Sequence, residues 1–152
     1  MEPDERARVG ELLSGVALHH LETVLSERPD AAVTVLSAEL RASWMSRRGS
    51  REVLGVAGGA DVEVSLGDHI VDRDLSRFQA AVDLALGGGS VEFRGGAIPR
   101  GGSEIVVRAV LWPSLDHSAV VALLTVEDGE AGATNGSLAT SDATSDLTPS
   151  EG

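Results

Sequence analysis

The clearest pattern of apolar and polar positions begins at Asp72 and predicts an amphipathic helix followed by strands. Apolar residues recur at helical spacing along one stripe of this segment: Leu75, Phe78, Val82, Ala85 and Leu86. Glycines 87–89 end the helix, because a left-handed cap costs glycine nothing. Three segments rich in valine, isoleucine and leucine then predict strands: 90–98, 105–112 and 119–126. The predicted core is a helix packed on an antiparallel sheet.

The strand at 105–112 is apolar on both of its faces. One face carries Ile105, Val107, Ala109 and Leu111, and the other carries Val106, Arg108, Val110 and Trp112. An antiparallel sheet with one solvated face would show polar residues on that face. The outer side of this sheet is therefore predicted to be covered, either by the same chain or by a partner. In the preceding strand, Gly95 and Gly96 predict a bulge or bend.

A second helix is predicted at 11–27, and its apolar arc is wider than packing on a single core requires. Its main stripe is Leu13, Ala17, Leu21 and Val24. Gly15 lowers the helix propensity of its interior by about 1 kcal/mol, and Pro29 ends it. Two short β-rich runs, 31–37 and 40–45, follow with the spacing of a hairpin. The wide helix is the candidate cover for the outer face of the sheet.

The two ends of the chain differ in composition from the part between them. Residues 1–10 are mostly polar, and residues 129–152 consist mainly of serine, threonine, glycine, alanine and acids, without lysine or arginine. Such segments do not offset the entropy lost on ordering, so both are predicted to be disordered. One domain is expected, at 11–128.

Charge and composition exclude several classes of function. The formal net charge of −12 argues against nucleic-acid binding, which needs lysine and arginine. The absence of cysteine excludes disulfides, thiolate nucleophiles and cysteine-held metals. The first residues have no apolar segment of a signal peptide, and no apolar run approaches the ~20 residues of a membrane span. A cytoplasmic protein without membrane contact is the expectation.

Four motifs follow one another over about residues 18–128: HHLETVLSERPDAAVTVLSAELR, SREVLG, DHIVDRDLSRFQAAVDLALGGGSVEFR and VRAVLWP. In this order they resemble the PAS domain, a sensor and interaction module of bacterial signalling proteins. The first is similar to the family's first helix and hairpin, the second to a short helix, the third to the long helix and next strand, and the fourth to the penultimate strand. The resemblance implies an α+β fold, with a five-stranded antiparallel sheet, helices on one face and an N-terminal amphipathic helix. Two positions depart from the family pattern, where Ser46 replaces a common asparagine and Val71 a common histidine.

The resemblance also implies a cavity between the sheet and the helices. The residues expected to line it are Met45, Ile70, Phe78 and Phe93. Its expected ligand is a small apolar or aromatic molecule, and the alternative is that Phe78 fills a solid core. The cofactor stays unknown at this level. His69 is the one candidate for an axial haem ligand, and the cysteine-linked flavin subtype is excluded because the chain has no cysteine.

No catalytic or metal site is predicted. Asp72 and Asp74 are first-turn helix charges rather than a general acid and base. An interface is expected on the first helix and the outer face of the sheet, at Leu13, Leu21, Val24, Val110 and Trp112. The predicted function is a non-enzymatic sensor and interaction module that forms a homodimer or contacts a signalling protein. The alternatives are a sensor loaded with haem or flavin, and a detached input domain of a diguanylate cyclase or histidine kinase.

Overall fold

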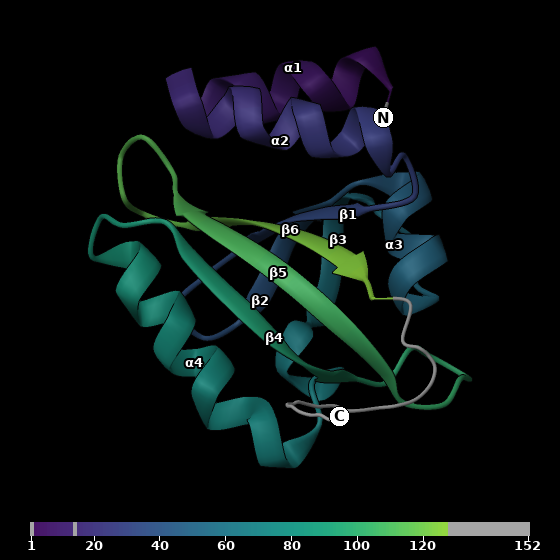
Figure 1. The fold of residues 1–152 in the computed structure, drawn as a ribbon. Coiled ribbons are helices and arrows are strands. Elements are labelled where there is room, and N and C mark those ends of the chain that lie inside the picture. The colour runs from purple at the N-terminus through teal and green to yellow at the C-terminus, as the bar shows by residue number, and fades with distance from the viewer. Residues whose placement is uncertain (1, 14, 128–152) are drawn as a thin grey trace, which may run out of the picture.

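A six-stranded antiparallel sheet lies at the centre of the computed structural model, which describes residues 2–13 and 15–127 (Figure 1). The strand order is β3-β2-β1-β6-β5-β4. The strands are β1 (Ala32–Leu36), β2 (Arg41–Met45), β3 (Gly59–Ser65), β4 (Val91–Ala97), β5 (Ile105–Pro113) and β6 (Val120–Val126). The helices are α1 (Pro3–Leu12), α2 (Gly15–Glu27), α3 (Arg47–Leu54) and α4 (Asp72–Leu86), and a 3₁₀ turn, η1, spans Leu66–Asp68.

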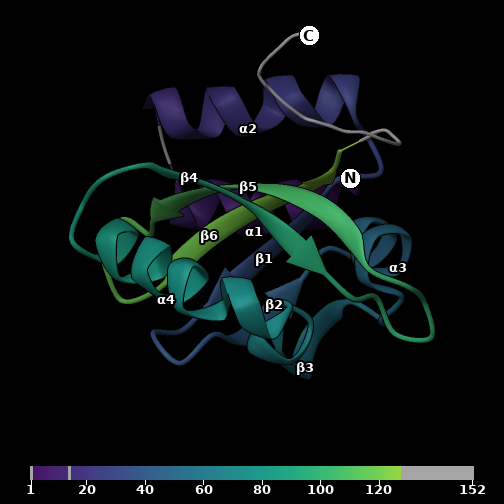
Figure 2. The same cartoon turned by 60° about the horizontal axis from the view of Figure 1, so that its bottom comes forward.

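The predicted α+β fold with an antiparallel sheet is confirmed, with one strand more than the five expected. The additional strand is β3, which pairs with β2 at one edge of the sheet. Helices α3 and α4 cover one face, called here the inner face, and α1 and α2 cover the opposite, outer face (Figures 1 and 2). The sheet thus lies between two helical layers.

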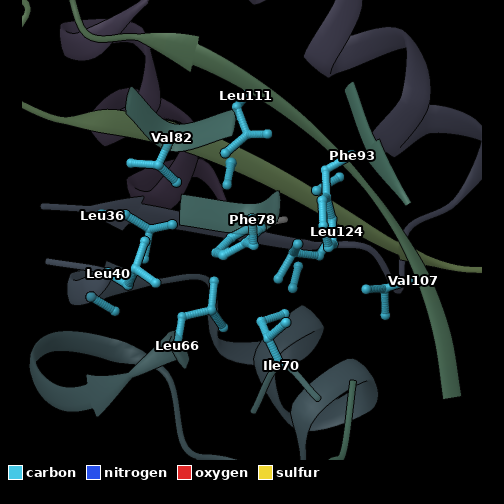
Figure 3. Packing of buried hydrophobic residues seen from close by; sticks show 14 of the residues in the cluster. Leu36, Leu40, Leu66, Ile70, Phe78, Val82, Phe93, Val107, Leu111 and Leu124 are labelled. Atoms are coloured by element: carbon cyan, nitrogen blue, oxygen red, sulfur yellow. The ribbon is translucent and has the colours of Figure 1, made fainter. Parts of the chain in front are cut away.

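Each helical layer encloses its own apolar core. Strand β1 shows the division, because Ala32 and Leu36 point into the inner core while Val33 and Val35 point into the outer one. All four side chains are at most 3% exposed. The inner core also contains the apolar stripe of α4 (Figure 3). The two-sided apolar strands predicted from the sequence therefore reflect two cores that share one sheet.

The N-terminal segment departs from the sequence prediction. Residues 1–10 were expected to be disordered, and this is wrong for the described part, because α1 spans Pro3–Leu12. Pro3 supplies a suitable φ at the first helical position, and Asp4 and Glu5 place negative charge at the positive end of the helix dipole. The helix expected at 11–27 begins only at Gly15, whose φ of +62° breaks the chain direction between α1 and α2. The predicted disorder of 129–152 falls outside the described residues.

The outer face is covered along only part of β5. Trp112 is 5% exposed beneath the α1–α2 layer, whereas Val110 is half-buried and Val106 is 37% exposed. The expectation that the whole outer face would be covered is therefore wrong at the Val106 end of the strand. There the outer face instead carries charged residues, where Arg94 and Arg108 both bind the carboxylate of Glu127.

Candidate functional site

The four residues expected to line a pocket lie together in the inner core. Met45, Ile70, Phe78 and Phe93 come from β2, the segment after η1, α4 and β4, and each is at most 4% exposed. The rings of Phe78 and Phe93 meet edge to face, with centroids 4.9 Å apart (Figure 3). The guanidinium of Arg77 lies over Phe93, 5.0 Å from its centroid, and shields the ring from solvent.

A carboxylate fixes the position of α4 against the sheet. One oxygen of Asp74 accepts a hydrogen bond from the backbone N–H of Gly96 at 2.9 Å, and the other accepts one from Arg77 at 2.7 Å. The Gly96 N–H, followed by Arg77, lowers the pKa of Asp74 although burial opposes this shift. The β4–β5 register is unbroken through Gly95 and Gly96, so the predicted bulge is wrong. These glycines instead allow close packing, since a Cβ at Gly95 would come within 2.6 Å of the Phe93 ring.

We expect the Asp74 contact to make stability depend on acid pH. A carboxyl group whose pKa is lowered by folding stabilises the fold above its unfolded pKa of about 3.9. That stabilisation is lost as the pH falls through the lower pKa of the folded state. Asp74→Asn should lower the free energy of unfolding by about 1–2 kcal/mol at pH 7. It should also flatten the fall in stability between about pH 5 and pH 2. Urea titrations at several pH values measure both effects, and an unchanged pH slope would contradict this role.

Two buried hydroxyl groups have no hydrogen-bond partner within the described part of the chain. They are the Thr34 side chain on β1 and the Ser50 side chain on α3, each 0% exposed. Thr34 lies between Ala32 and Leu36, so strand alternation directs it to the inner face, where those two neighbours pack. A buried hydroxyl without a partner is costly, by about 1–3 kcal/mol. Apolar packing does not account for the burial of these two hydroxyl groups.

Small and large side chains alternate on the inner face of the sheet. An alanine from each of five strands belongs to the inner core: Ala32, Ala42, Ala97, Ala109 and Ala122. The strands also contribute larger side chains to this core, and others come from α4 and the segments around η1. Met45, which is unbranched and has several rotatable bonds, lies among them and can change rotamer at small cost.

His69, the candidate haem ligand, is held by the backbone near the end of β4. Its Nδ1 atom lies 2.9 Å from the carbonyl oxygen of Ile98, and its own carbonyl accepts the N–H of Ile98. A carbonyl oxygen only accepts hydrogen bonds, so Nδ1 is the donor and Nε2 is the ring atom left for another partner. The imidazole is partly exposed, and it precedes the buried Ile70.

The residues expected at an interface lie mainly within the chain's own outer core. Leu13, Leu21 and Trp112 are 2%, 0% and 5% exposed, and Val24 and Val110 are half-buried against the same cluster. His20 on α2 contacts the Trp112 ring edge to face, with centroids 5.5 Å apart. Of the two covers that the sequence allowed, the structure shows the one supplied by the same chain. A partner can reach these side chains only if α1 and α2 move.

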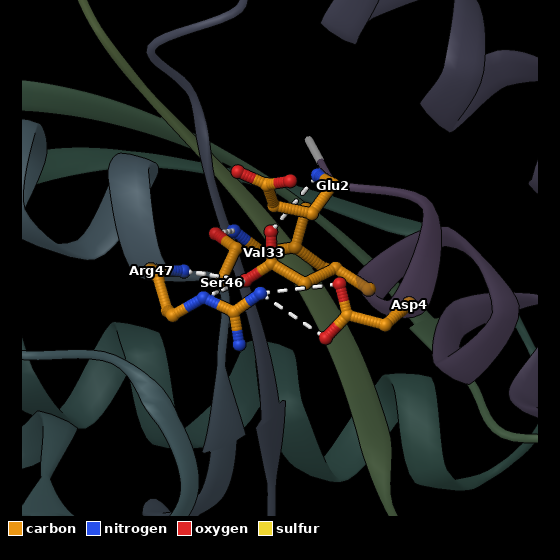
Figure 4. Close-up of polar contacts among 6 residues, drawn as sticks. Glu2, Asp4, Val33, Ser46 and Arg47 are labelled. Atoms are coloured by element: carbon orange, nitrogen blue, oxygen red, sulfur yellow. Dashed lines mark hydrogen bonds and ion pairs between the residues drawn. The ribbon is translucent and has the colours of Figure 1, made fainter.

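A buried carboxylate joins the outer helices to the inner layer, and no sequence pattern predicted it (Figure 4). Glu5 on α1 is 2% exposed, and one of its oxygens accepts the backbone N–H of Arg47, the first residue of α3, at 2.7 Å. The other oxygen accepts the N–H of Glu2 at 3.1 Å. Ser46, which precedes α3, does not cap it with its hydroxyl, because that oxygen accepts the N–H of Val33. Glu5 therefore caps α3 from another helix.

An ion pair between Asp4 and Arg47 lies beside this contact at the surface. Both carboxylate oxygens of Asp4 accept hydrogen bonds from the Arg47 guanidinium at 3.1 Å. The hydrogen bond from Arg47 lowers the pKa of Asp4, and the contact with Asp4 raises the pKa of Arg47. An open groove of about 440 Å³ lies beside the pair, lined by Glu2, Pro3, Glu5, Arg47, Arg48 and Arg51. The sequence showed only charged residues here, and the burial of Glu5 among them depends on the tertiary contact.

Among residues 2–13 and 15–127, no group of three or more histidine, aspartate or glutamate side chains lies close enough to hold a metal ion. No helix among the same residues is long and apolar enough to cross a bilayer.

Comparison with known proteins gives structural matches only, since no family model and no curated protein matches the sequence. The PAS domain of a protein from Colwellia psychrerythraea aligns with a TM-score of 0.56 at 12% identity, over 68% of this chain and 97% of that chain. A sensory box histidine kinase/response regulator from Burkholderia thailandensis aligns with a TM-score of 0.52 at 12% identity, over 69% and 82%. Both matches show a class of fold, the antiparallel α+β domain. Within that class, the chain has the PAS fold, as its motifs predicted.

Proposed function

We propose that this chain is a non-enzymatic sensor module of bacterial signal transduction that binds a small ligand in its inner core and acts as a homodimer. The PAS fold supports the sensor role, because one structural neighbour described above is a PAS domain and the other is a sensory box histidine kinase/response regulator. The ligand is a small aromatic or apolar molecule with one polar group, and the module works in the cytoplasm. Binding energy, rather than a chemical step, carries the signal.

The unpartnered hydroxyl of Thr34 is the observation that carries the ligand proposal. It is completely buried on the inner face of β1, within a core that also holds Phe78 and Phe93. A ligand ring would pack against the phenylalanines while its polar group bonds to Thr34. Met45 can change rotamer, and alanines lie among the larger side chains of the sheet, so the inner core can rearrange around such a ligand.

Phenol tests this proposal, because it combines an aromatic ring with one hydroxyl, and toluene is the control that lacks the hydroxyl. We expect phenol to shift the NMR signals of Phe78 and Phe93. Thr34→Val, which keeps the shape but removes the hydroxyl, should weaken phenol binding about tenfold and leave toluene binding unchanged. The same substitution should raise the free energy of unfolding of the empty protein by about 1 kcal/mol. Thr125→Val on β6 is the matched control, since Thr125 is not fully buried.

Two results would contradict the ligand site. One is that phenol leaves the signals of both phenylalanines unchanged at saturating concentration. The other is that Thr34→Val binds phenol as tightly as the unsubstituted protein does. A stability loss in Thr34→Val would also show that the hydroxyl has a partner in the folded protein.

A further inference from the structure

The α1–α2 hairpin is held to the rest of the chain by few polar contacts. At one end, Glu5 caps α3 and Asp4 pairs with Arg47. At the other end, the N–H of Leu115 in the β5–β6 turn donates to the carbonyl of Leu12 at 2.9 Å. Of the residues of α1, only Glu5 and Val9 are buried. The Glu5 contact thus holds the first end of α1, and the hydrogen bond at Leu12 holds its other end.

Glu5 is also the point at which the two helical layers touch through a buried charge. Helix α3 belongs to the inner layer, since Val53 and Leu54 lie in the inner core, whereas Val9 of α1 lies in the outer core. The Glu5 carboxylate bonds to the first backbone N–H of α3, so any shift of α3 changes this contact directly. A buried carboxylate that loses its hydrogen-bond partners strongly lowers the stability of the arrangement that buries it. The position of α3 therefore controls how firmly the hairpin is held.

The surface under the hairpin is apolar and belongs mainly to four strands, β1, β2, β5 and β6. Its largest members are the two tryptophans, Trp44 on β2 and Trp112 on β5, with Val33, Val121 and Leu123 between them. Monomeric proteins rarely expose an apolar patch of this kind, because it binds other surfaces. The α1–α2 hairpin fits this surface within one chain. A second copy of the chain carries an identical hairpin, which would fit it in the same way. Exchange of identical elements remakes every contact between the two chains.

We propose that Glu5 is a latch, and that its release from α3 lets two copies of the chain dimerise by exchanging their α1–α2 hairpins over the outer face of the sheet. This inference rests on the homodimer proposed above, and it names the surface through which the two copies bind each other. In the exchanged dimer, Glu5 of each chain caps α3 of the other chain. The link between α2 and β1, at residues 28–31, is the hinge, and Arg28 anchors it by donating to the carbonyl of Val126.

Glu5→Ala tests the latch, with Glu11→Ala as the matched control on the same helix. Glu11 is exposed and pairs with Arg8 within α1, so its loss changes the charge equally but leaves α3 alone. Both tryptophans of the chain lie under the hairpin, so quenching of their fluorescence by acrylamide reports its opening. Glu5→Ala should raise the fraction of open hairpin about tenfold, as expected for one lost hydrogen bond to a charged group. Because the exchanged dimer also lacks both Glu5 contacts, the dissociation constant should stay the same, and light scattering should show dimer forming at least about tenfold faster after the protein is concentrated.

An engineered disulfide tests the exchange itself, and the absence of native cysteine makes its result clear. Leu12→Cys with Leu115→Cys joins the two positions linked by the backbone hydrogen bond at the far end of the hairpin. Oxidation at low protein concentration should give an intrachain bond and a permanent monomer. Oxidation after incubation at high concentration should give dimers linked between chains on a non-reducing gel.

Different outcomes overturn different parts of the proposal. If Glu5→Ala keeps the circular dichroism of the fold and its tryptophans stay shielded, the latch is wrong. If the tryptophans open but the protein stays monomeric, a second copy is not the occupant. If dimers form and the disulfide never links two chains, the homodimer stands and the hairpin exchange fails. Should Glu5→Ala not fold, Glu5→Gln, which keeps one acceptor oxygen, gives the same comparison with a smaller expected opening.

Discussion

Replacing Phe78 with alanine is expected to lower the free energy of unfolding by about 3–5 kcal/mol, the usual cost of deleting a buried phenylalanine. Phe78 is 0% exposed at the centre of the inner core, and it meets Phe93 edge to face. The substitution removes apolar area, an aromatic pair and packing contacts that the surrounding alanines are too small to replace. Denaturant titration followed by circular dichroism measures the loss, which is large for a domain of this size.

Leu84→Ala provides the control for Phe78→Ala. Leu84 lies on the same helix, α4, but is 66% exposed, so its truncation should change stability by less than about 0.5 kcal/mol. A small effect of Phe78→Ala would mean that the inner core contracts around the gap.

Gly49→Ala is the second substitution with a large expected effect, and the structure decides its sign. Within a helix, replacing glycine by alanine normally stabilises by about 1 kcal/mol. A Cβ at Gly49, however, would lie 2.1 Å from the carbonyl oxygen of Ala31 and 2.5 Å from the Cα of Ala32. Both obstacles are backbone atoms of the link and strand next to α3, so they cannot rotate away. We expect a net loss of about 2 kcal/mol or more, together with displacement of α3.

Gly10→Ala is the matched helix control, and it should have the opposite sign. Gly10 lies in α1, and a Cβ there meets no atom within 4 Å. Its replacement should raise the free energy of unfolding by about 0.5–1 kcal/mol. Paired thermal and urea titrations of the two variants measure both effects. Stabilisation by Gly49→Ala would show that α3 can move away from β1 at little cost.

The parts of the fold that the sequence predicted well are those with long and regular patterns. The helix expected from Asp72 to Leu86 has these bounds in the structure, because its apolar stripe repeats over four turns and glycines end it. Strand β3 was missed, because it starts in a glycine-rich stretch and carries acidic residues among its valines. Helix α1 was missed because its segment is mostly charged. Its order depends on the burial of Glu5 and Val9, which sequence pattern does not reveal.

The candidate site was predicted in part. The four expected pocket residues share the inner core, as strand alternation and helical periodicity indicated. Thr34 was missed because threonine is common in β-strands, and nothing in AAVTVLS shows whether its hydroxyl finds a partner. Pairing in the interior depends on which groups the fold brings opposite one another. For the same reason, the sequence did not predict whether Leu21 and Trp112 would be buried by the same chain or by a partner. An apolar helix fits a sheet equally well within a chain or between chains.

The strand order has a consequence for how fast the domain assembles. The two central strands, β1 and β6, are the first and last of the strands described between residues 15 and 127, and Ala32 pairs with Leu124 across almost the whole domain. Until β6 is synthesised, the β1–β3 and β4–β5 units have no ladder between them, and their inward edges are open to other chains. Closing so long a loop before any central contact forms costs entropy and slows folding. Nascent chains of this protein should therefore depend on protection from aggregation until the last strand leaves the ribosome.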